Sequence, residues 1–306
     1  MKNSIRTTLA IGAAGVIAAT GVGCASTGGS DDAAAEGDYI AVTLWRPHWA
    51  YDAYDIKDLE DPEGALGQTE SIYSYGRTGF DTDYPQASQW ISDFAMSSEL
   101  LYSLENVLYN ENADAGVDEY PGLVEEWAAE NQEYVDGLSD ATTVGGDQED
   151  ITIGVFNGWP EGEAVSLLWE YVLENAGYTV ELQYADAGPV FVGVSQGDFD
   201  VTLDVWLPLT HESYVEQYGD DMVELGAWND EAVLTVAVSA DAPIDSLAEL
   251  AENADLFGNR IVGIEPGAGL TAAMEDAVIP GYGLEDMDFS TSSTPAMLSE
   301  LARSQR

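Results

Sequence analysis

The second half of the chain alternates between two hydrophobic periodicities. Short β-branched runs, which are typical of buried strands, are separated by segments whose apolar residues recur at helical spacing. The clearest helical segment spans 163–178, with Gly177 placed to terminate it. The predicted strands are ITIGVF (151–156), TVELQYA (179–185), DVTLDVW (200–206), VLTVAVS (233–239) and RIVGIE (260–265). This alternation predicts an α/β fold of parallel sheets with helices on both faces.

Three of the eight tryptophans lie where predicted strands end. Trp45 ends a further predicted strand, DYIAVTLW (38–45), Trp206 ends DVTLDVW, and Trp159 follows ITIGVF after two residues. Ligands of such folds bind beyond the carboxyl ends of the strands, so these three rings are candidate ligand contacts. The other five tryptophans have core spacing (Trp90, Trp127, Trp169) or fit either role (Trp49, Trp228).

A glycine-rich turn, GIEPGAGL (263–270), joins a predicted strand to a predicted helix, TAAMEDAVI (271–279). The free N–H groups and the dipole of a helix start favour an anion. No Gly-Lys-Ser/Thr follows, so the turn is not a P-loop. Three rings that attract a cation, at about 0.5–2 kcal/mol each, together with an anion site predict a small zwitterion that carries a quaternary ammonium.

The charge of the chain is strongly one-sided. Eight Lys and Arg face 57 Asp and Glu, a formal net charge of -49, which disfavours nucleic acid and anionic lipid as partners. Hydrophobic residues make up 45% of the chain, which is enough for a packed core. We interpret the acidity as adaptation to a salty medium. The alternative, a calcium-binding surface, lacks support because no EF-hand loop is present.

The first 23 residues have the pattern of a signal peptide. Lys2 and Arg6 precede a short apolar, small-residue run, and no acid occurs before Asp31. The run ends at Cys24, the only cysteine, in a context that resembles a bacterial lipobox, so we predict lipidation of Cys24. The alternative is ordinary cleavage nearby, with an incidental thiol. We predict that residues 24–37 then form a flexible, lipid-anchored tether.

Several motifs together resemble one known family. They are VTLWRPHWAYDAYDIKDLEDPEG (42–64), NGWPEGEAVSLL (157–168), DVWLPLTH (204–211), IVGIEPGAG (261–269) and SSTPAML (292–298). From residue 38 onward the chain resembles the glycine betaine/proline betaine substrate-binding proteins of ABC importers. The resemblance implies a two-lobed, type II periplasmic-binding-protein-like clamshell with the ligand cleft between its lobes. It also implies an extracytoplasmic or periplasmic receptor, anchored to the membrane, that delivers osmolytes to an ABC permease in a halophilic or salt-stressed cell.

The resemblance assigns roles to individual residues and implies neither cofactor nor metal. Three rings would form the walls of the ammonium cage, two backbone N–H groups would bind the carboxylate, and one histidine would lie close to that carboxylate. The walls of the cage would be Trp45, Trp159 and Trp206. The N–H groups that bind the carboxylate would belong to Gly269 and Leu270, and the histidine close to it would be His211. His48 is a possible further site residue, for which we favour a structural hydrogen bond, and Arg46 has no assigned role.

The motifs stand in an unusual order. In many relatives the segment that resembles ITIGVFNGW comes first and the W-x-P-H-W strand comes late, whereas here that strand opens the mature chain. The sequence therefore resembles a circular permutation of the family, with 136–150 joining the former ends. One predicted lobe is then split, 38–68 with 244–306, and the other is 69–243.

Other functions fit the sequence less well. A choline- or carnitine-binding receptor of the same fold is the nearest alternative. An enzyme acting on quaternary amines would need catalytic groups, and the sequence has two histidines and no Ser-His-Asp or metal-ligand spacing. In an adhesive or structural lipoprotein the rings would belong to the core alone.

Overall fold

The computed structural model describes residues 39–140 and 150–305. The predicted signal peptide (1–23), the tether (24–37) with Cys24, and most of the predicted linker lie outside the described residues. Within the described part, none of the helices has the length and apolar character needed to cross a membrane.

The described strands form one mixed sheet in the order β5-β4-β6-β3-β7-β1-β8-β9, with β2 pairing to β7. Their bounds are β1 Ala41–Arg46, β2 Ile56–Asp58, β3 Glu70–Arg77, β4 Asp150–Phe156, β5 Thr179–Ala185, β6 Val201–Leu207, β7 Met222–Ser239, β8 Arg260–Val262 and β9 Asp288–Ser290. The α/β class predicted from the sequence is confirmed.

The prediction of parallel sheets is only partly right. The pairs β4–β5, β4–β6, β1–β8 and β8–β9 are parallel, but β7 is antiparallel to β1, β2 and β3, and β3 is antiparallel to β6. Parallel neighbours need crossover helices, which the sequence pattern shows. The antiparallel pairs join strands that are far apart in the chain, so no local sequence pattern predicts this pairing.

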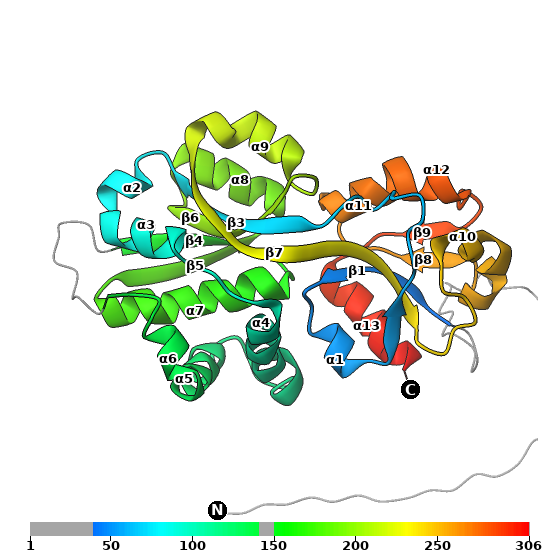
Figure 1. The fold of residues 1–306 in the computed structure, drawn as a ribbon, viewed down its shortest axis with the longest axis horizontal. Coiled ribbons are helices and arrows are strands. Elements are labelled where there is room, and N and C mark those ends of the chain that lie inside the picture. The colour runs from blue at the N-terminus through cyan, green and yellow to red at the C-terminus, as the bar shows by residue number, and fades with distance from the viewer. Residues whose placement is uncertain (1–38, 141–149, 306) are drawn as a thin grey trace, which may run out of the picture. The chain divides into compact units, whose positions relative to one another are not determined.

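Strand β7 connects two groups of elements. Its first part, from Met222 to Ala232, pairs with β3, and its second part, from Val233 to Val238, pairs with β1. In Figure 1 this long strand runs from the group around β3 to β6 toward the group around β1, β8 and β9. The predicted lobe boundaries, 38–68 with 244–306 and 69–243, stay a prediction.

Helices cover the sheet on both sides (Figure 1). Around β3 to β6 they are α2 Phe80–Asp83, α3 Pro85–Ser92, α4 Ser98–Glu105, η1 Asn106–Glu111, α5 Tyr120–Glu130, α6 Gln132–Val135, α7 Pro160–Ala176, α8 Ala187–Gln196, α9 Glu212–Tyr218 and η2 Gly219–Asp221. Around β1, β8 and β9 they are α1 Ala50–Ala53, α10 Leu247–Leu250, η3 Ala251–Phe257, α11 Gly269–Ala273, η4 Met274–Val278, α12 Ile279–Tyr282 and α13 Thr294–Ser304.

The strand order changes direction at β4. The chain passes from β4 through α7 to β5 on one side, and then through α8 to β6 on the other side of β4. Because both crossovers are expected to be right-handed, α7 and α8 lie on opposite faces of the sheet. A crevice forms at such a reversal beyond the carboxyl ends of the two strands. Trp159 and Trp206 stand at that point.

Helix α7 shows how the local sequence sets the limits of an element. Pro160 occupies its first turn, where no backbone N–H is needed. The helix ends at Gly177, whose φ of 105° is left-handed, so the predicted terminator is confirmed. Trp169 is fully buried and packs on Phe94, which places this ring in the core.

Candidate functional site

The carboxyl ends of β1 and β6 meet along β7. Strand β6 is antiparallel to β3, β3 to β7 and β7 to β1, so the carboxyl ends of β6 and β1 point toward each other. Each strand carries a tryptophan as its next-to-last residue, Trp206 in β6 and Trp45 in β1. Trp159 comes from the turn between β4 and α7. Three distant segments of sequence therefore deliver their rings to one place.

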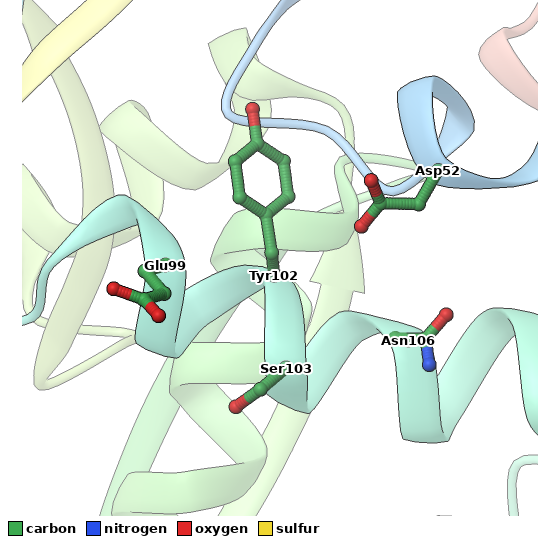
Figure 2. Close-up of a pocket in the computed structure, with 5 residues that line it drawn as sticks. All are labelled: Asp52, Glu99, Tyr102, Ser103 and Asn106. Carbon is green, nitrogen blue, oxygen red and sulfur yellow. The ribbon is translucent and has the colours of Figure 1, made fainter.

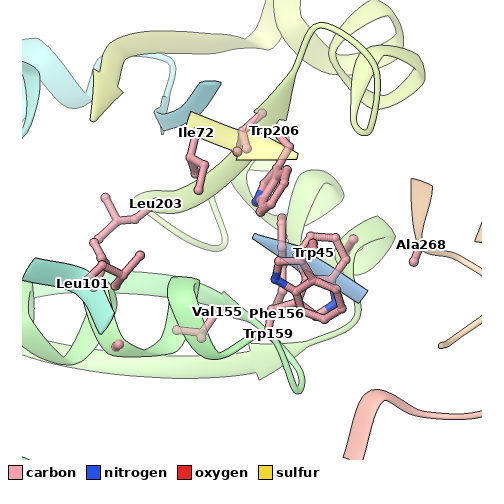
Figure 3. Close-up of a cluster of buried hydrophobic side chains, with 14 of the residues drawn as sticks. Trp45, Ile72, Leu101, Val155, Phe156, Trp159, Leu203, Trp206 and Ala268 are labelled. Carbon is pink, nitrogen blue, oxygen red and sulfur yellow. The ribbon is translucent and has the colours of Figure 1, made fainter. Parts of the chain in front are cut away.

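The ring of Trp159 contacts the rings of both Trp45 and Trp206, and Figure 3 shows the three side chains together. The ring centroids of Trp45 and Trp159 are 5.6 Å apart with planes at 37°, and those of Trp159 and Trp206 are 6.5 Å apart with planes at 88°. All three are buried, with exposed fractions of 3%, 5% and 1% for Trp45, Trp159 and Trp206.

Between the rings is a small apolar cavity of about 10 Å³, on the order of one water molecule. It is completed by Thr210, Leu234, Ile264 and Leu270. A quaternary ammonium is far larger than a water molecule, so its entry requires the rings to move apart.

Each indole N–H of this ring cage, defined as Trp45, Trp159 and Trp206, faces an acidic side chain. Trp159 Nε1 donates to Glu265 Oε1 at 2.7 Å, and Trp206 Nε1 donates to Asp204 Oδ1 at 2.8 Å. Trp45 Nε1 has no partner of ordinary hydrogen-bond geometry among the described residues, but it faces Glu161 and lowers the pKa of that carboxyl. The N–H edges of all three rings are thus directed at carboxyls.

The start of α11 adjoins the ring cage. Gly269 and Leu270 are its first two residues, whose backbone N–H groups have no partner within a helix. A Cβ on Gly269 would stand 2.2 Å from the carbonyl oxygen of Thr210, so only glycine permits this approach. Glu70 holds the opposing segment, because its carboxylate accepts the backbone N–H groups of Leu209 and Thr210 at 2.8 and 2.9 Å.

His211 is buried against the cage. Its ring stacks on Trp159 at 5.4 Å between centroids, and its Nδ1 accepts the backbone N–H of Trp206 at 2.9 Å. Burial lowers the pKa of His211 to about 3, so the ring is neutral and its remaining proton is assigned to Nε2. Nε2 has no hydrogen-bond partner among the described residues. It is a free donor beside the cage.

His48 follows the same arrangement at the end of β1. Its Nδ1 accepts the backbone N–H of Ala50 at 3.0 Å, its ring meets Trp45 edge-on at 4.9 Å, and burial lowers its pKa to about 3. Arg46, which had no assigned role, pairs with Asp58 at 2.7 Å and lies over the ring of Tyr51.

Besides Glu70, three carboxyl groups are buried near the cage: Glu105 on α4, Glu161 on α7 and Asp204 on β6. Burial raises the pKa of Glu161 to about 8, with a further contribution from the charge of Glu265. Burial, followed by the charge of Glu161, raises the pKa values of Glu105 and Asp204 well above their ordinary range. At neutral pH this cluster therefore holds protons.

The sequence reasoning did not find these three carboxyls. One signal was available for Asp204, because residues two apart in a strand share a face and Asp204 precedes Trp206 by two. Glu161 is adjacent to the candidate segment in NGWPEGE, but nothing local distinguishes it from the exposed acids that dominate the chain. Glu105 reaches the site only through the packing of α4 on α7.

A larger and more open hollow of about 620 Å³ lies elsewhere, between α1 and α4. Figure 2 shows Tyr102, Ser103 and Asn106 on the helical segment, with Asp52 from α1 opposite them. Glu99 completes the lining. It offers one phenol ring and two exposed carboxylates, without the apolar enclosure that a methylated cation requires. Its size does not make it the better candidate.

The comparison with protein families agrees with this geometry. The family described as the substrate binding domain of ABC-type glycine betaine transport systems matches residues 16–130 and 149–306. The chain belongs to this family. The residues between the two matched ranges, 131–148, overlap the segment predicted to join the former ends of a permuted chain (136–150).

Individual relatives resemble parts of the chain. The glycine betaine/carnitine transport binding protein of Listeria monocytogenes is 27% identical over 188 residues, which are 61% of this chain and 60% of the relative. The solved glycine betaine/L-proline-binding protein of Borrelia burgdorferi is 26% identical, with a TM-score of 0.44 over 51% of this chain and 58% of that one.

A solved lactococcal protein, in its closed form with glycine betaine, is 22% identical, with a TM-score of 0.40 over 51% and 59%. The chain thus spans about three fifths of the length of these relatives.

Proposed function

We propose that this protein is the extracytoplasmic substrate-binding component of an ABC importer for glycine betaine or proline betaine. The observation that carries the proposal is the convergence of Trp45, Trp159 and Trp206, with the start of α11, on one apolar cavity. Membership of the glycine betaine family supports it. The family consists of transport substrate-binding domains, and we propose a binding rather than a catalytic role for this chain.

The ring cage binds the quaternary ammonium. Such a cation has no N–H to donate, so a carboxylate cannot hold it by a directed hydrogen bond. Ring faces attract it at about 0.5–2 kcal/mol each, and apolar contact with the methyl groups adds to this. Hydrated sodium gains little from an indole face. The cage therefore selects the methylated cation from a salty medium.

The start of α11 and His211 bind the opposite end of the ligand. In this proposal the N–H groups of Gly269 and Leu270 donate to the carboxylate of the ligand, and the free Nε2 of His211 donates to it as well. Because both histidines of the described chain are neutral, the carboxylate is held by hydrogen bonds and the helix start rather than by a full positive charge.

Binding requires an opening motion, because the cavity between the rings is about 10 Å³. Trp206 and Trp159 belong to the elements around β4 and β6, whereas Trp45 and α11 belong to those around β1 and β8. We propose that the two groups separate about β7 and the segment before β3. This is the hinge closure known for binding proteins, and the closed form then docks on the permease.

The cellular setting follows from residues outside the described part. We propose that the segment 1–23 directs export and that Cys24 is lipidated, which would anchor the protein to the membrane beside its permease. The net charge of -49 suits a salty exterior. Mass spectrometry of the mature N-terminus tests the lipid. An unmodified cysteine, or cleavage elsewhere, would contradict the anchor.

Carnitine is a second candidate ligand, because the relative from Listeria monocytogenes is described as a glycine betaine/carnitine binding protein. Carnitine also has a quaternary ammonium and a carboxylate, but they are further apart. Choline lacks the carboxylate and would leave Gly269, Leu270 and His211 without a partner.

Calorimetric titration with the three compounds tests the function. We expect glycine betaine to bind, carnitine to bind with similar or lower affinity, and choline to bind most weakly. Quenching or enhancement of tryptophan fluorescence on binding should accompany the heat. Absence of binding by all three compounds would refute the proposed function. Tightest binding of choline would refute the anion site at α11.

A further inference from the structure

The buried cluster of Glu105, Glu161 and Asp204 is unusual because its oxygens are largely unpartnered. Neither oxygen of Glu105 or Glu161 has a hydrogen-bond partner of ordinary geometry in the described part of the chain, and the same is true of Oδ2 of Asp204. Buried charges normally have partners, since an isolated carboxylate is costly away from water. The cluster therefore needs an explanation beyond stability.

Two structural explanations do not account for it. No group of three or more Asp, Glu, His or Cys among the described residues is placed to hold a metal ion. No internal cation neutralises the cluster either, because the described cations interact elsewhere: Arg46 with Asp58, Lys57 with Asp245, Arg77 with Asp83 and Asp200, Arg260 with Glu300, and Arg303 with the Ser299 carbonyl.

The cluster is directly connected to the ring cage. Asp204 accepts the Nε1–H of Trp206 at 2.8 Å, and Glu161 is faced by the indole N–H groups of both Trp45 and Trp206. A negative charge at the N–H edge makes an indole ring more electron-rich, which strengthens its attraction for a cation at its face. A cation in the cage in turn favours the charged form of a nearby carboxyl. The two events must therefore favour each other.

We propose that Glu161, together with Asp204 and Glu105, is a proton-linked counter-charge for the cage: this cluster releases a proton when a quaternary ammonium binds. This inference rests on the proposed function. In the step, the O–H bond of one carboxyl breaks, its electron pair stays on the carboxylate, and the proton passes to the buffer. No oxidant, reductant or other reactant is needed.

The groups around Glu161 set the size of the release. Asp204 on β6, Glu105 on α4 and Glu265 from the turn after β8 oppose its ionisation, and so does burial. The indole N–H groups of Trp45 and Trp206 favour ionisation, as does the backbone at the start of α7. The histidines nearest the cage, His48 and His211, are buried and neutral, and they change charge only near pH 3. We therefore expect less than one proton per ligand.

Glycine betaine titrations of the whole chain in phosphate and in Tris test the release, because the two buffers differ widely in their heat of protonation. At pH 7.5 the observed heats should differ by the amount that a fraction of a proton requires. The dissociation constant should also fall by about three- to tenfold between pH 6.5 and 8.5, since full release of one proton gives tenfold per pH unit.

Glu161→Gln is the decisive variant. Glutamine has the same shape and can still accept indole N–H groups, but it carries no proton to release. The difference in heat between the two buffers should be much smaller for this variant, and its affinity should depend much less on pH. Glu105→Gln, which touches no cage ring, should reduce the release by a smaller amount and provides the same test if Glu161→Gln does not fold. Glu174→Gln, on the exposed side of α7, is the matched control and should behave as the unaltered chain.

The outcomes separate the inference from the function. Binding of glycine betaine with equal heats in both buffers and no pH dependence refutes the inference and leaves the proposed function intact. Undiminished proton release in Glu161→Gln and Glu105→Gln assigns the proton to another group and also refutes the inference. Absence of glycine betaine binding at every pH refutes the proposed function, and the inference with it.

Discussion

The ends of β1 and β6 are built alike. Each has a tryptophan next to last, then a cis X-Pro bond, Arg46-Pro47 or Leu207-Pro208. Each is followed by a buried histidine that accepts a backbone N–H at Nδ1 and has no partner at Nε2 in the described chain. The two ends face each other and contribute one ring each to the cage.

They differ in the residue two positions before the tryptophan. In β6 this is Asp204, which binds the indole N–H of Trp206 from the same strand. In β1 it is Thr43, whose buried hydroxyl has no partner in the described part. Trp45 therefore faces a carboxyl only when Glu161 of α7 is brought against it. The indole N–H of Trp206 is bound within its own strand, whereas that of Trp45 faces an acid from a different group of elements.

Replacing Trp159, the ring that contacts the tryptophans of both strand ends, should have the largest effect on affinity. Trp159 contacts Trp45 and Trp206, so Trp159→Ala removes one cation–π face and disrupts both neighbours. We expect the dissociation constant for glycine betaine to rise at least about 30-fold, the equivalent of about 2 kcal/mol. Calorimetry measures it, with Trp159→Phe as the control that keeps a ring face. Unchanged affinity in Trp159→Ala would mean that the rings are core alone.

Replacing Trp206 or Trp45 should affect binding in the same direction but the free energy of unfolding to different extents. Trp206→Ala leaves Asp204 buried without its donor, whereas Trp45→Ala leaves no acid of its own strand unpartnered. We expect both variants to lose affinity, and Trp206→Ala to lose about 1–3 kcal/mol more free energy of unfolding than Trp45→Ala. Denaturant unfolding of the two variants measures this difference. Equal losses would show that Asp204 does not depend on the indole.

The close packing of Asp204 against α7 can be tested by a substitution in that helix. A Cβ on Gly162, in the first turn of α7, would stand 2.3 Å from Asp204 Oδ2. We expect Gly162→Ala to destabilise the protein by about 1–3 kcal/mol through this overlap. Gly122→Ala, in the exposed start of α5 with no atom within 4 Å, should stabilise by up to about 1 kcal/mol. Stabilisation by Gly162→Ala would contradict the described contact.

The pH dependence of stability should be the smallest effect. The pKa of Glu161 is raised from 4.5 to about 8, so the folded protein binds more protons than the unfolded chain in that window and its stability falls as pH rises. The pKa values of His48 and His211 are lowered from 6.5 to about 3, which makes stability rise with pH up to 6.5. Above pH 6.5 only the carboxyl effect remains.

Between pH 6.5 and 8 we therefore expect Glu161 to contribute a loss on the order of 1–2 kcal/mol, which Glu161→Gln should remove. Glu105 and Asp204 act in the same direction, so a smaller loss should remain in that variant. Measuring the free energy of unfolding in high salt, which screens the acidic surface, isolates the contribution of the buried carboxyls to the pH dependence. An equally steep loss in Glu161→Gln would show that Glu161 is not a source of the effect.

Local patterns predicted much of the fold. The runs at 151–156, 179–185 and 200–206 lie within one residue of β4, β5 and β6, and the helix after Trp159 is α7. The strand β3 and the first part of β7 were not predicted, since their burial depends on antiparallel partners far away in the chain. The predicted strand at 260–265 is shorter, because β8 ends at Val262 where the turn begins.

The sequence by itself determined the residues with cage chemistry. A tryptophan at the end of a β-branched run, or a glycine before a helix, is a local feature set by a few neighbouring side chains. The roles assigned to Trp45, Trp159, Trp206, Gly269, Leu270, His211 and His48 stay predictions until a ligand is measured.

Only the tertiary structure decided which acids are buried next to the cage. Glu105, Glu161 and Asp204 are ordinary acids in a chain that has 57 acidic residues, and their burial beside other acids makes them different. The energy of a carboxyl depends on the water it has lost and on the charges around it. Both are properties of packing between distant segments, so they exist only once α4, α7 and β6 have come together.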